Sequence, residues 1–185
     1  MSWLAERVIF LDRDGVINRR RPDHVRSIQE LDFLPGSLAA LRRLHQRGER
    51  VVVVTNQSAV GRGLITAGEL DSIHRWMIEA VANTGGHIER IYVCPHLPSQ
   101  GCMCRKPRIG MLLRGARELE IDLQLSVLVG DSLSDVLAAR AAGCQPIFVG
   151  DRPPTTGDDD IPVVADLCEA VSLLASQRPR TRVGC

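Results

Sequence analysis

Apolar residues follow two patterns that alternate along the chain. Short unbroken runs of branched and aromatic residues are typical of buried strands. Between the runs, apolar residues recur every three or four positions, as on one face of a helix. The runs predict strands at Val8–Leu11, Val51–Val54, Ile88–Val93, Val127–Val129, Pro146–Val149 and Val163–Val164. The spaced pattern predicts helices at Ser37–Gln46, Thr66–Asn83, Met111–Glu120 and Asp166–Ala175.

Strands that alternate with helices indicate an α/β fold built on a parallel sheet. An unbroken apolar run such as Val51–Val54 suits a strand that is covered on both faces. A chain of 185 residues is long enough for one domain with a substantial core. We therefore expect a mostly parallel sheet flanked by helices in a single domain over residues 1–176, followed by a flexible arginine-rich tail at 177–185.

Composition narrows the class of protein. Hydrophobic residues make up 44% of the chain and the formal net charge is +1, so no global field attracts it to nucleic acid or to a membrane. Aromatic residues make up 3%, which argues against base-stacking surfaces. The sequence has no apolar run of transmembrane length and no signal-peptide pattern. We expect a cytoplasmic monomer that binds neither nucleic acid nor membranes.

Two aspartates and a glycine end the first predicted strand. Residues i and i+2 of an extended segment point to the same side, so Asp12 and Asp14 are expected to converge on one spot. Two carboxylates this close repel each other unless a cation or a shared proton compensates. Mg²⁺ suits such a pair, because it prefers carboxylate oxygens and keeps waters for an incoming phosphate. The same residues also suit an ordinary turn.

Four soft or borderline metal ligands follow the third predicted strand. Cys94, His96, Cys102 and Cys104 have the paired CxH and CxC spacing of a zinc site. Three thiolates and one imidazole complete a tetrahedron, so no position stays open for catalysis and the zinc is structural. A chance cluster of free thiols is the alternative. We expect a zinc-binding loop over residues 94–104.

Polar residues also follow the second and fourth predicted strands. Thr55, Asn56 and Gln57 offer a hydroxyl and two amides that suit phosphate oxygens, although such residues are common in turns as well. Asp131 follows the fourth strand. Because α/β folds place their sites at the carboxyl ends of parallel strands, these side chains should lie near Asp12.

Basic residues flank the same region. Arg20 and Arg21 lie in the polar loop after the first strand, which is either a solvated loop or a segment whose guanidinium groups bind a second anionic group. Lys106 follows the zinc loop, from where it can reach a phosphate and offset the charge of the aspartates. Arg105, next to it, is expected to contact the rest of the substrate.

Together these motifs resemble the haloacid dehalogenase (HAD) phosphatase superfamily, with DxDG after the first strand, a threonine after the second, a lysine after the third and GDxxxD after the fourth. The resemblance implies a Rossmann-like HAD fold without a large cap domain, with the zinc loop in the place of the second insertion. The residues that it makes catalytic are Asp12, Asp14, Thr55 and Lys106, and those that it makes magnesium ligands are Asp12 through its side chain, Asp14 through its carbonyl, and Asp131. Asp12 would form an aspartyl-phosphate, and Asp135 would orient Lys106 or the waters of the site.

The combination of DRDGVIN, TNQS, CPH…CxCRKP and GDSLSD is narrower, and resembles the subgroup of histidinol-phosphate and D-glycero-D-manno-heptose 1,7-bisphosphate phosphatases. It implies a sugar-phosphate substrate, most directly the 7-phosphate of the heptose bisphosphate, for a glycan such as lipopolysaccharide. The expected substrate contacts are Arg20, Arg21, Asn56, Gln57, Arg105 and Ser132, the last in a place where some relatives carry lysine. Histidinol phosphate, a polynucleotide 3′-phosphate and a zinc-knuckle nucleic-acid-binding module are the alternatives.

Overall fold

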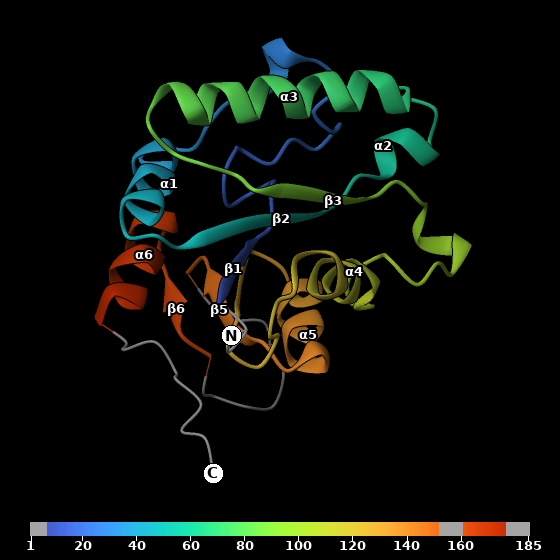
Figure 1. The fold of residues 1–185 in the computed structure, drawn as a ribbon. Coiled ribbons are helices and arrows are strands. Elements are labelled where there is room, and N and C mark those ends of the chain that lie inside the picture. The colour runs from blue at the N-terminus through green and yellow to red at the C-terminus, as the bar shows by residue number, and fades with distance from the viewer. Residues whose placement is uncertain (1–6, 152–160, 177–185) are drawn as a thin grey trace.

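The computed structural model describes residues 7–151 and 161–176 (Figure 1). At its centre six parallel strands form one sheet in the order β3-β2-β1-β4-β5-β6. The strands are β1 (Val8–Leu11), β2 (Arg50–Asn56), β3 (Arg90–Cys94), β4 (Val127–Gly130), β5 (Gln145–Val149) and β6 (Val163–Val164). The predicted parallel sheet is confirmed, and its strands begin and end close to the predicted residues.

Helices follow the strands as the alternating pattern predicts. They are α1 (Ser37–Gln46), α2 (Ser58–Gly61), α3 (Ala67–Asn83), α4 (Gly110–Leu119), α5 (Leu133–Ala142) and α6 (Leu167–Ser176), with short 3-10 helices η1 (Ile28–Glu30) and η2 (Pro98–Gln100). A capping box begins α3, because Thr66 Oγ1 accepts from the Glu69 N–H (3.1 Å) and the Glu69 carboxylate accepts from the Thr66 N–H (2.7 Å). Helix α2 has four residues, too few for a periodic pattern to predict.

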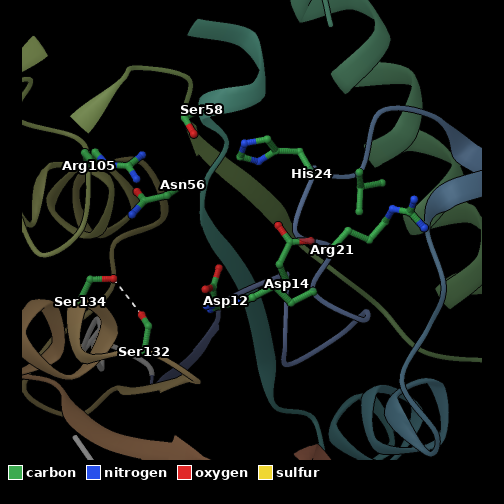
Figure 2. Close-up of a pocket in the computed structure, with 11 residues that line it drawn as sticks. Asp12, Asp14, Arg21, His24, Asn56, Ser58, Arg105, Ser132 and Ser134 are labelled. Carbon is green, nitrogen blue, oxygen red and sulfur yellow. Dashed lines mark hydrogen bonds between the residues drawn. The ribbon is translucent and has the colours of Figure 1, made fainter. Parts of the chain in front are cut away.

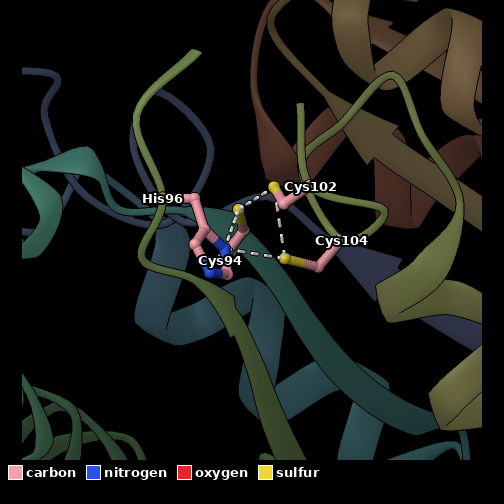
Figure 3. Close-up of side chains that lie close together, drawn as sticks. All are labelled: Cys94, His96, Cys102 and Cys104. Carbon is pink, nitrogen blue, oxygen red and sulfur yellow. Dashed lines mark hydrogen bonds between the residues drawn. The ribbon is translucent and has the colours of Figure 1, made fainter. Parts of the chain in front are cut away.

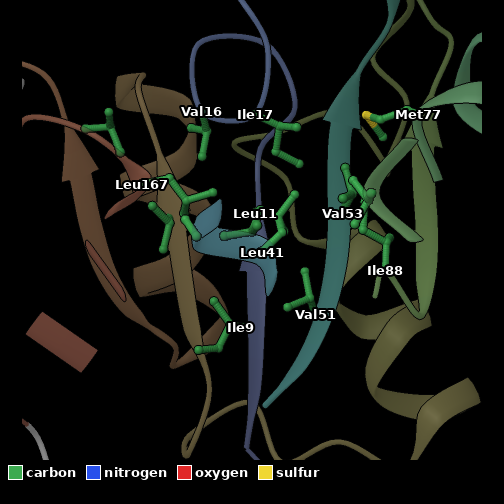
Figure 4. Close-up of a cluster of buried hydrophobic side chains, with 14 of the residues drawn as sticks. Ile9, Leu11, Val16, Ile17, Leu41, Val51, Val53, Met77, Ile88 and Leu167 are labelled. Atoms are coloured by element: carbon green, nitrogen blue, oxygen red, sulfur yellow. The ribbon is translucent and has the colours of Figure 1, made fainter. Parts of the chain in front are cut away.

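The helices cover both faces of the sheet. α1, α3 and α6 lie over one face, and α4 and α5 lie over the other (Figure 1). Side chains of β1 alternate between the two cores: Ile9 and Leu11 pack under α1, α3 and α6 (Figure 4), while Val8 and Phe10 pack under α4 and α5. All four are fully buried, which is why their run in the sequence is unbroken.

The strand order changes direction between β1 and β4, because β2 and β3 add to one side of β1 and the later strands to the other. The carboxyl ends of these two strands therefore border the crevice where open α/β sheets bind ligands. The segments 12–36 and 95–109, where a cap would be inserted, hold only η1 and η2 as helices. In the described ranges no helix combines the length and apolar character needed to cross a membrane. The predicted tail at 177–185 lies outside the described residues.

Candidate active site and metal centres

The end of β1 carries Asp12 into the crevice. The Asp12 N–H donates to the Val129 carbonyl (2.9 Å), which extends the pairing of β1 with β4 by one residue. The following N–H, that of Arg13, donates to Asp12 Oδ1 (2.7 Å). Asp12 is 8% exposed. Its carboxylate is therefore held in one direction while a small part of its surface stays accessible.

Lys106 connects Asp12 to α5. Its Nζ lies 3.0 Å from Asp12 Oδ1 and 2.6 Å from Asp135 Oδ1, and it donates to the Val54 carbonyl (2.7 Å). The other oxygen of Asp135 accepts from the Ser132 N–H (3.1 Å) at the start of α5. Asp135 thus orients the lysine, as the motif predicts, and the ammonium group lies between two carboxylates.

Asp131 completes a set of three carboxylates that fits magnesium. One oxygen from each of Asp12, Asp131 and Asp135 lies within 4.8 Å of the others. Opposite oxygen ligands of an octahedral Mg²⁺ are about 4.2 Å apart. Both oxygens of Asp135 already have partners, Lys106 and the Ser132 N–H, whereas Lys106 and the Arg13 N–H contact the same oxygen of Asp12. Asp12 and Asp131 are therefore the carboxylates that would hold the ion. Gly15 makes room for them, because it has a φ of +88° and a Cβ there would lie 1.8 Å from an oxygen of Asp131.

Asp14 lines the same cavity as Asp12, but its carboxylate is not part of this acidic cluster. The chain turns directly after Asp12, where the Asn18 N–H donates to the Arg13 carbonyl (3.1 Å), so the rule for extended chains no longer applies. The Asp14 carboxylate instead accepts from the guanidinium of Arg13 (2.9 Å), from Asn18 Nδ2 (2.8 Å) and from Gln57 Nε2 (2.7 Å). The expectation that both carboxylates converge on one cation is therefore corrected. The Asp14 carbonyl remains a predicted magnesium ligand.

The two aspartates have pKa values that are shifted in opposite directions. Burial raises the pKa of Asp12 to about 7, although the nearby Lys106 ammonium lowers it. Burial also acts to raise the pKa of Asp14, but the Arg13 guanidinium and the hydrogen bonds from Asn18 and Gln57 hold it below its usual value. A divalent cation beside Asp12 would favour its ionised, nucleophilic form.

The polar residues after β2 support their neighbours. Asn56 holds the backbone of Lys106 at both ends, since its Oδ1 accepts from the Lys106 N–H (3.1 Å) and its Nδ2 donates to the Lys106 carbonyl (3.2 Å). Gln57 donates to Asp14 and to Thr55 Oγ1 (2.9 Å). Gln57 and Thr55 are each 1% exposed. Gln57 thus lies behind Asp14 and not on the cavity wall, which differs from its predicted substrate contact.

A cavity of about 270 Å³ opens beside Asp12 (Figure 2). Its lining residues are Asp12, Asp14, Arg20, Arg21, His24, Val25, Asn56, Ser58, Arg105, Ser132 and Ser134. Arg20 and Arg21 come from the loop after β1, and Arg105 comes from the segment after the cysteines. Figure 2 shows Arg105 and Arg21 on opposite sides of the two aspartates, with the Arg21 guanidinium turned away from them, and Arg21 Nε lies 3.4 Å from Asp23 Oδ1. Arg20 also lies 2.6 Å from Asp131. Three arginines that line one cavity with Asp12 suit a substrate with more than one anionic group.

The sequence pattern does not single out several of the residues found here. His24, Ser58 and Ser134 line the cavity, and Ser134 Oγ lies 2.8 Å from Ser132 Oγ. Their only signal is their place just after strand ends or in the loop after β1. Arg13 is fully buried, and the strand pattern does not predict this, because β1 ends at Leu11 and the chain turns directly after Asp12.

Figure 3 shows Cys94, His96, Cys102 and Cys104 facing one another after β3. The Sγ atoms of Cys94 and Cys104 each lie 3.5 Å from that of Cys102. His96 Nδ1 lies 3.7 Å from Cys94 Sγ and 3.2 Å from Cys104 Sγ. A tetrahedron around Zn²⁺ with ordinary bond lengths has edges of about 3.5–3.8 Å. The donor set and its spacing therefore fit a closed zinc site.

The cysteine cluster and the active site share one segment of backbone. Arg105 Nη1 donates to the His96 carbonyl (3.3 Å), and Arg108 Nη1 donates to the Cys102 carbonyl (2.6 Å). The Gln57 N–H donates to the Cys94 carbonyl (2.8 Å). A metal that fixes the four ligands would thereby also fix the segment that carries Arg105 and Lys106.

Comparison with known proteins agrees with this geometry. A family model described as HAD-hydrolase-like matches residues 103–169. The chain is 43% identical over 173 residues to the D-glycero-beta-D-manno-heptose-1,7-bisphosphate 7-phosphatase of Bordetella bronchiseptica, covering 92% of this chain and 97% of that one. It is 44% identical over 149 residues to the D-glycero-alpha-D-manno-heptose-1,7-bisphosphate 7-phosphatase of Mycobacterium tuberculosis, covering 77% and 78%.

A solved structure supports the same relationship. The crystal structure of D,D-heptose 1,7-bisphosphate phosphatase from B. bronchiseptica, complexed with magnesium and phosphate, matches this fold with a TM-score of 0.84 at 40% identity, over 92% of this chain and 98% of that one. Identity at this level over nearly the whole of both chains establishes common ancestry as well as a common fold. The chain therefore belongs to the HAD-like phosphatases, in the branch of the heptose 1,7-bisphosphate phosphatases.

Proposed function

We propose that the protein hydrolyses the 7-phosphate of D-glycero-D-manno-heptose 1,7-bisphosphate with the help of Mg²⁺. The observation that carries this proposal is the cavity beside Asp12, whose wall bears Arg20, Arg21 and Arg105. One phosphate would lie against Asp12, and the arginines would bind the other. Relatives that align over most of this chain act, by name, on the same bisphosphate.

The chemistry follows from the positions of the two aspartates. An oxygen of Asp12 attacks phosphorus in line and forms an aspartyl-phosphate, while the bond from phosphorus to the sugar oxygen breaks. In the free site the pKa of Asp14 lies below its usual value, so Asp14 would take up a proton as the anionic phosphate binds beside it, and it then gives this proton to the leaving oxygen. Water then attacks the aspartyl-phosphate, Asp14 takes a proton from it, and phosphate leaves as the carboxylate of Asp12 is restored.

Other residues would stabilise charge on the transferring group. Lys106 lies 3.0 Å from Asp12, and Thr55 is connected to Asp14 through Gln57 Nε2. Both would hold the equatorial oxygens, where charge must be balanced in the transition state. Bound magnesium would supply Lewis-acid compensation for the repulsion between the carboxylate and the phosphate. Zinc, at the separate cysteine cluster, would have a structural role only.

The test is phosphate release with magnesium from four substrates compared by kcat/KM: both anomers of the heptose bisphosphate, histidinol phosphate and a 3′-phosphorylated oligonucleotide. We expect a preference of tenfold or more, about 1.4 kcal/mol of transition-state discrimination, for one bisphosphate anomer. A higher kcat/KM for histidinol phosphate would leave the roles of the catalytic residues unchanged, but it would contradict the binding of a second phosphate by the arginines. Salt-sensitive binding to oligonucleotide without turnover would favour the zinc-knuckle alternative.

Cellular context is part of the same proposal. We expect the protein to be a cytoplasmic monomer. Its product, a heptose monophosphate, would supply the synthesis of a glycan such as lipopolysaccharide, in keeping with a small open site that binds a sugar phosphate. Sedimentation of the purified protein and the glycan profile of a deletion strain would test the two statements separately.

A further inference from the structure

Arg13 lies between the two aspartates of the motif but does not line the cavity beside them. Its side chain has no exposed surface. A buried guanidinium is costly unless it is paired and its N–H groups are satisfied. Its partners therefore indicate what it contributes to the site.

Those partners lie on two sides of the guanidinium. Toward the cavity, Nη2 lies 2.9 Å from each oxygen of Asp14, and Nε donates to Asp14 Oδ1 (3.2 Å). Away from the cavity, Nη1 lies 3.0 Å from Nε2 of His74, a buried residue of α3. Since a guanidinium can only donate, His74 accepts at Nε2 and carries its own proton on Nδ1. Burial, with the Arg13 charge, lowers the pKa of His74 to about 3, so the acceptor stays neutral.

We propose that His74 is a positioning residue for Asp14 and acts through the guanidinium of Arg13. This inference rests on the proposed function, because it requires Asp14 to transfer the protons. The planar fork of Arg13 reaches both oxygens of Asp14, which the single ammonium of a lysine could not do in the same geometry. His74 holds the far side of that fork, so α3 fixes the orientation of the acid–base group.

A positioning residue and an ordinary core residue have different kinetic effects. A sugar alkoxide needs a proton from Asp14 to leave, whereas 4-nitrophenolate leaves without one. A misplaced Asp14 therefore slows bond cleavage in the sugar ester far more than in 4-nitrophenyl phosphate. Hydrolysis of the aspartyl-phosphate still needs Asp14 as base, so the aryl ester should release one equivalent of nitrophenolate rapidly and then turn over slowly.

The experiment compares His74→Leu, which removes the acceptor, with His74→Gln, whose amide oxygen can replace it. Leu70→Ala, at a buried apolar position on the same helix, controls for loss of stability alone. We expect His74→Leu to lower kcat for the heptose bisphosphate by about tenfold or more, to leave KM within about twofold, and to show the nitrophenolate burst. His74→Gln should recover most of kcat, and Leu70→Ala should lower Tm without a burst.

Equal losses on both esters and no burst in His74→Leu would overturn the inference while leaving the proposed function intact. Hydrolysis of neither ester by the wild-type enzyme would instead reject the proposed function. In that case a double-mutant cycle of Asp14→Asn with His74→Leu decides the inference from Tm alone. If the double variant loses less Tm than the two single variants lose in sum, the connection through Arg13 is supported. Strictly additive losses of Tm overturn it. If His74→Leu does not fold, His74→Phe, which keeps a ring but has no acceptor, enters the same cycle.

Discussion

Replacing Lys106 by methionine would remove an ammonium group and keep most of the volume of its stem. Lys106 is 3% exposed, so water cannot take the place of the lost charge. Its Nζ contacts Asp12, Asp135 and the Val54 carbonyl at 3.0, 2.6 and 2.7 Å. Removing one partner of a buried ion pair costs about 3–5 kcal/mol, because the remaining charge is left uncompensated. We expect a loss of about this size in the free energy of unfolding of the magnesium-free protein near pH 8.

The pKa of Asp12 sets the pH dependence of that loss. Burial raises this pKa to about 7 in the wild-type protein, and removing the Lys106 ammonium will raise it further. Between the unfolded pKa of about 4 and the folded value, the folded state binds more protons, so stability falls as pH rises. In the variant this fall continues above pH 7, where it has ended in the wild-type protein. The difference in stability between the two proteins should therefore widen from pH 5.5 to pH 8.

Urea unfolding at the two pH values, with and without Mg²⁺, measures these differences. Magnesium should recover part of the loss, because it binds the folded carboxylates and replaces the missing charge. Adding Asp135→Asn to Lys106→Met should also recover part, since one unpaired carboxylate is then removed. Arg114→Met is the control: Arg114 pairs with Glu118 (2.7 Å) on an exposed surface, and its loss should leave stability unchanged. A loss for Lys106→Met that is the same at both pH values, or as small as in the control, would refute the reasoning.

Three further predictions use other parts of the site. Asp12→Asn should abolish turnover in the folded protein, and residual turnover with saturating Mg²⁺ would exclude Asp12 as nucleophile. The same change should make the metal-free protein more stable near pH 8, since it removes a carboxylate whose pKa is raised by burial. Cys102→Ser should lower zinc content, measured by mass spectrometry, together with Tm; full zinc occupancy at an unchanged Tm would exclude a structural zinc site. Gly15→Ala and Gly48→Ala both place a side chain at positive φ, and the strain should lower the free energy of unfolding by about 1 kcal/mol in each. A Cβ at Gly15 also collides with Asp131, whereas none of the described atoms lies within 4 Å of a Cβ at Gly48. Only Gly15→Ala should weaken magnesium binding by calorimetry, and equal affinities in the two variants would contradict the role of Asp131.

The sequence predicts the edge of the sheet at which the site forms, because its signals there are local. An apolar run marks β1, and the polar residue that follows it must lie where the strand ends. Asp12 and Asp131 follow β1 and β4, which pair directly, so the ends of these strands bring the two carboxylates together. The paired spacing of the cysteines is equally local. The order of residues within short segments is therefore enough to predict the fold, the acidic cluster and the four zinc-type ligands.

Contacts between distant segments are not visible in this way. His74 occupies a buried position on α3 among apolar residues, and nothing in the helical pattern separates it from a residue that only packs. Its contact with Arg13 spans 61 positions and depends on how α3 lies across the sheet. The turn after Asp12 likewise directs Asp14 toward Arg13, and only the backbone hydrogen bonds of that turn determine this direction.

The same limit changes how substrate discrimination must be understood. The amides of Asn56 and Gln57 suit phosphate in the sequence, yet in the structure they hold Lys106 and Asp14. Groups that are already committed to one another cannot turn toward a new ligand without leaving a buried partner unsatisfied. They therefore fix the reacting centre equally for any phosphate ester. Choice among esters then falls to the exposed side chains of the cavity wall, above all Arg20, whose side chain is 57% exposed and whose partner Asp131 would be neutralised by bound magnesium.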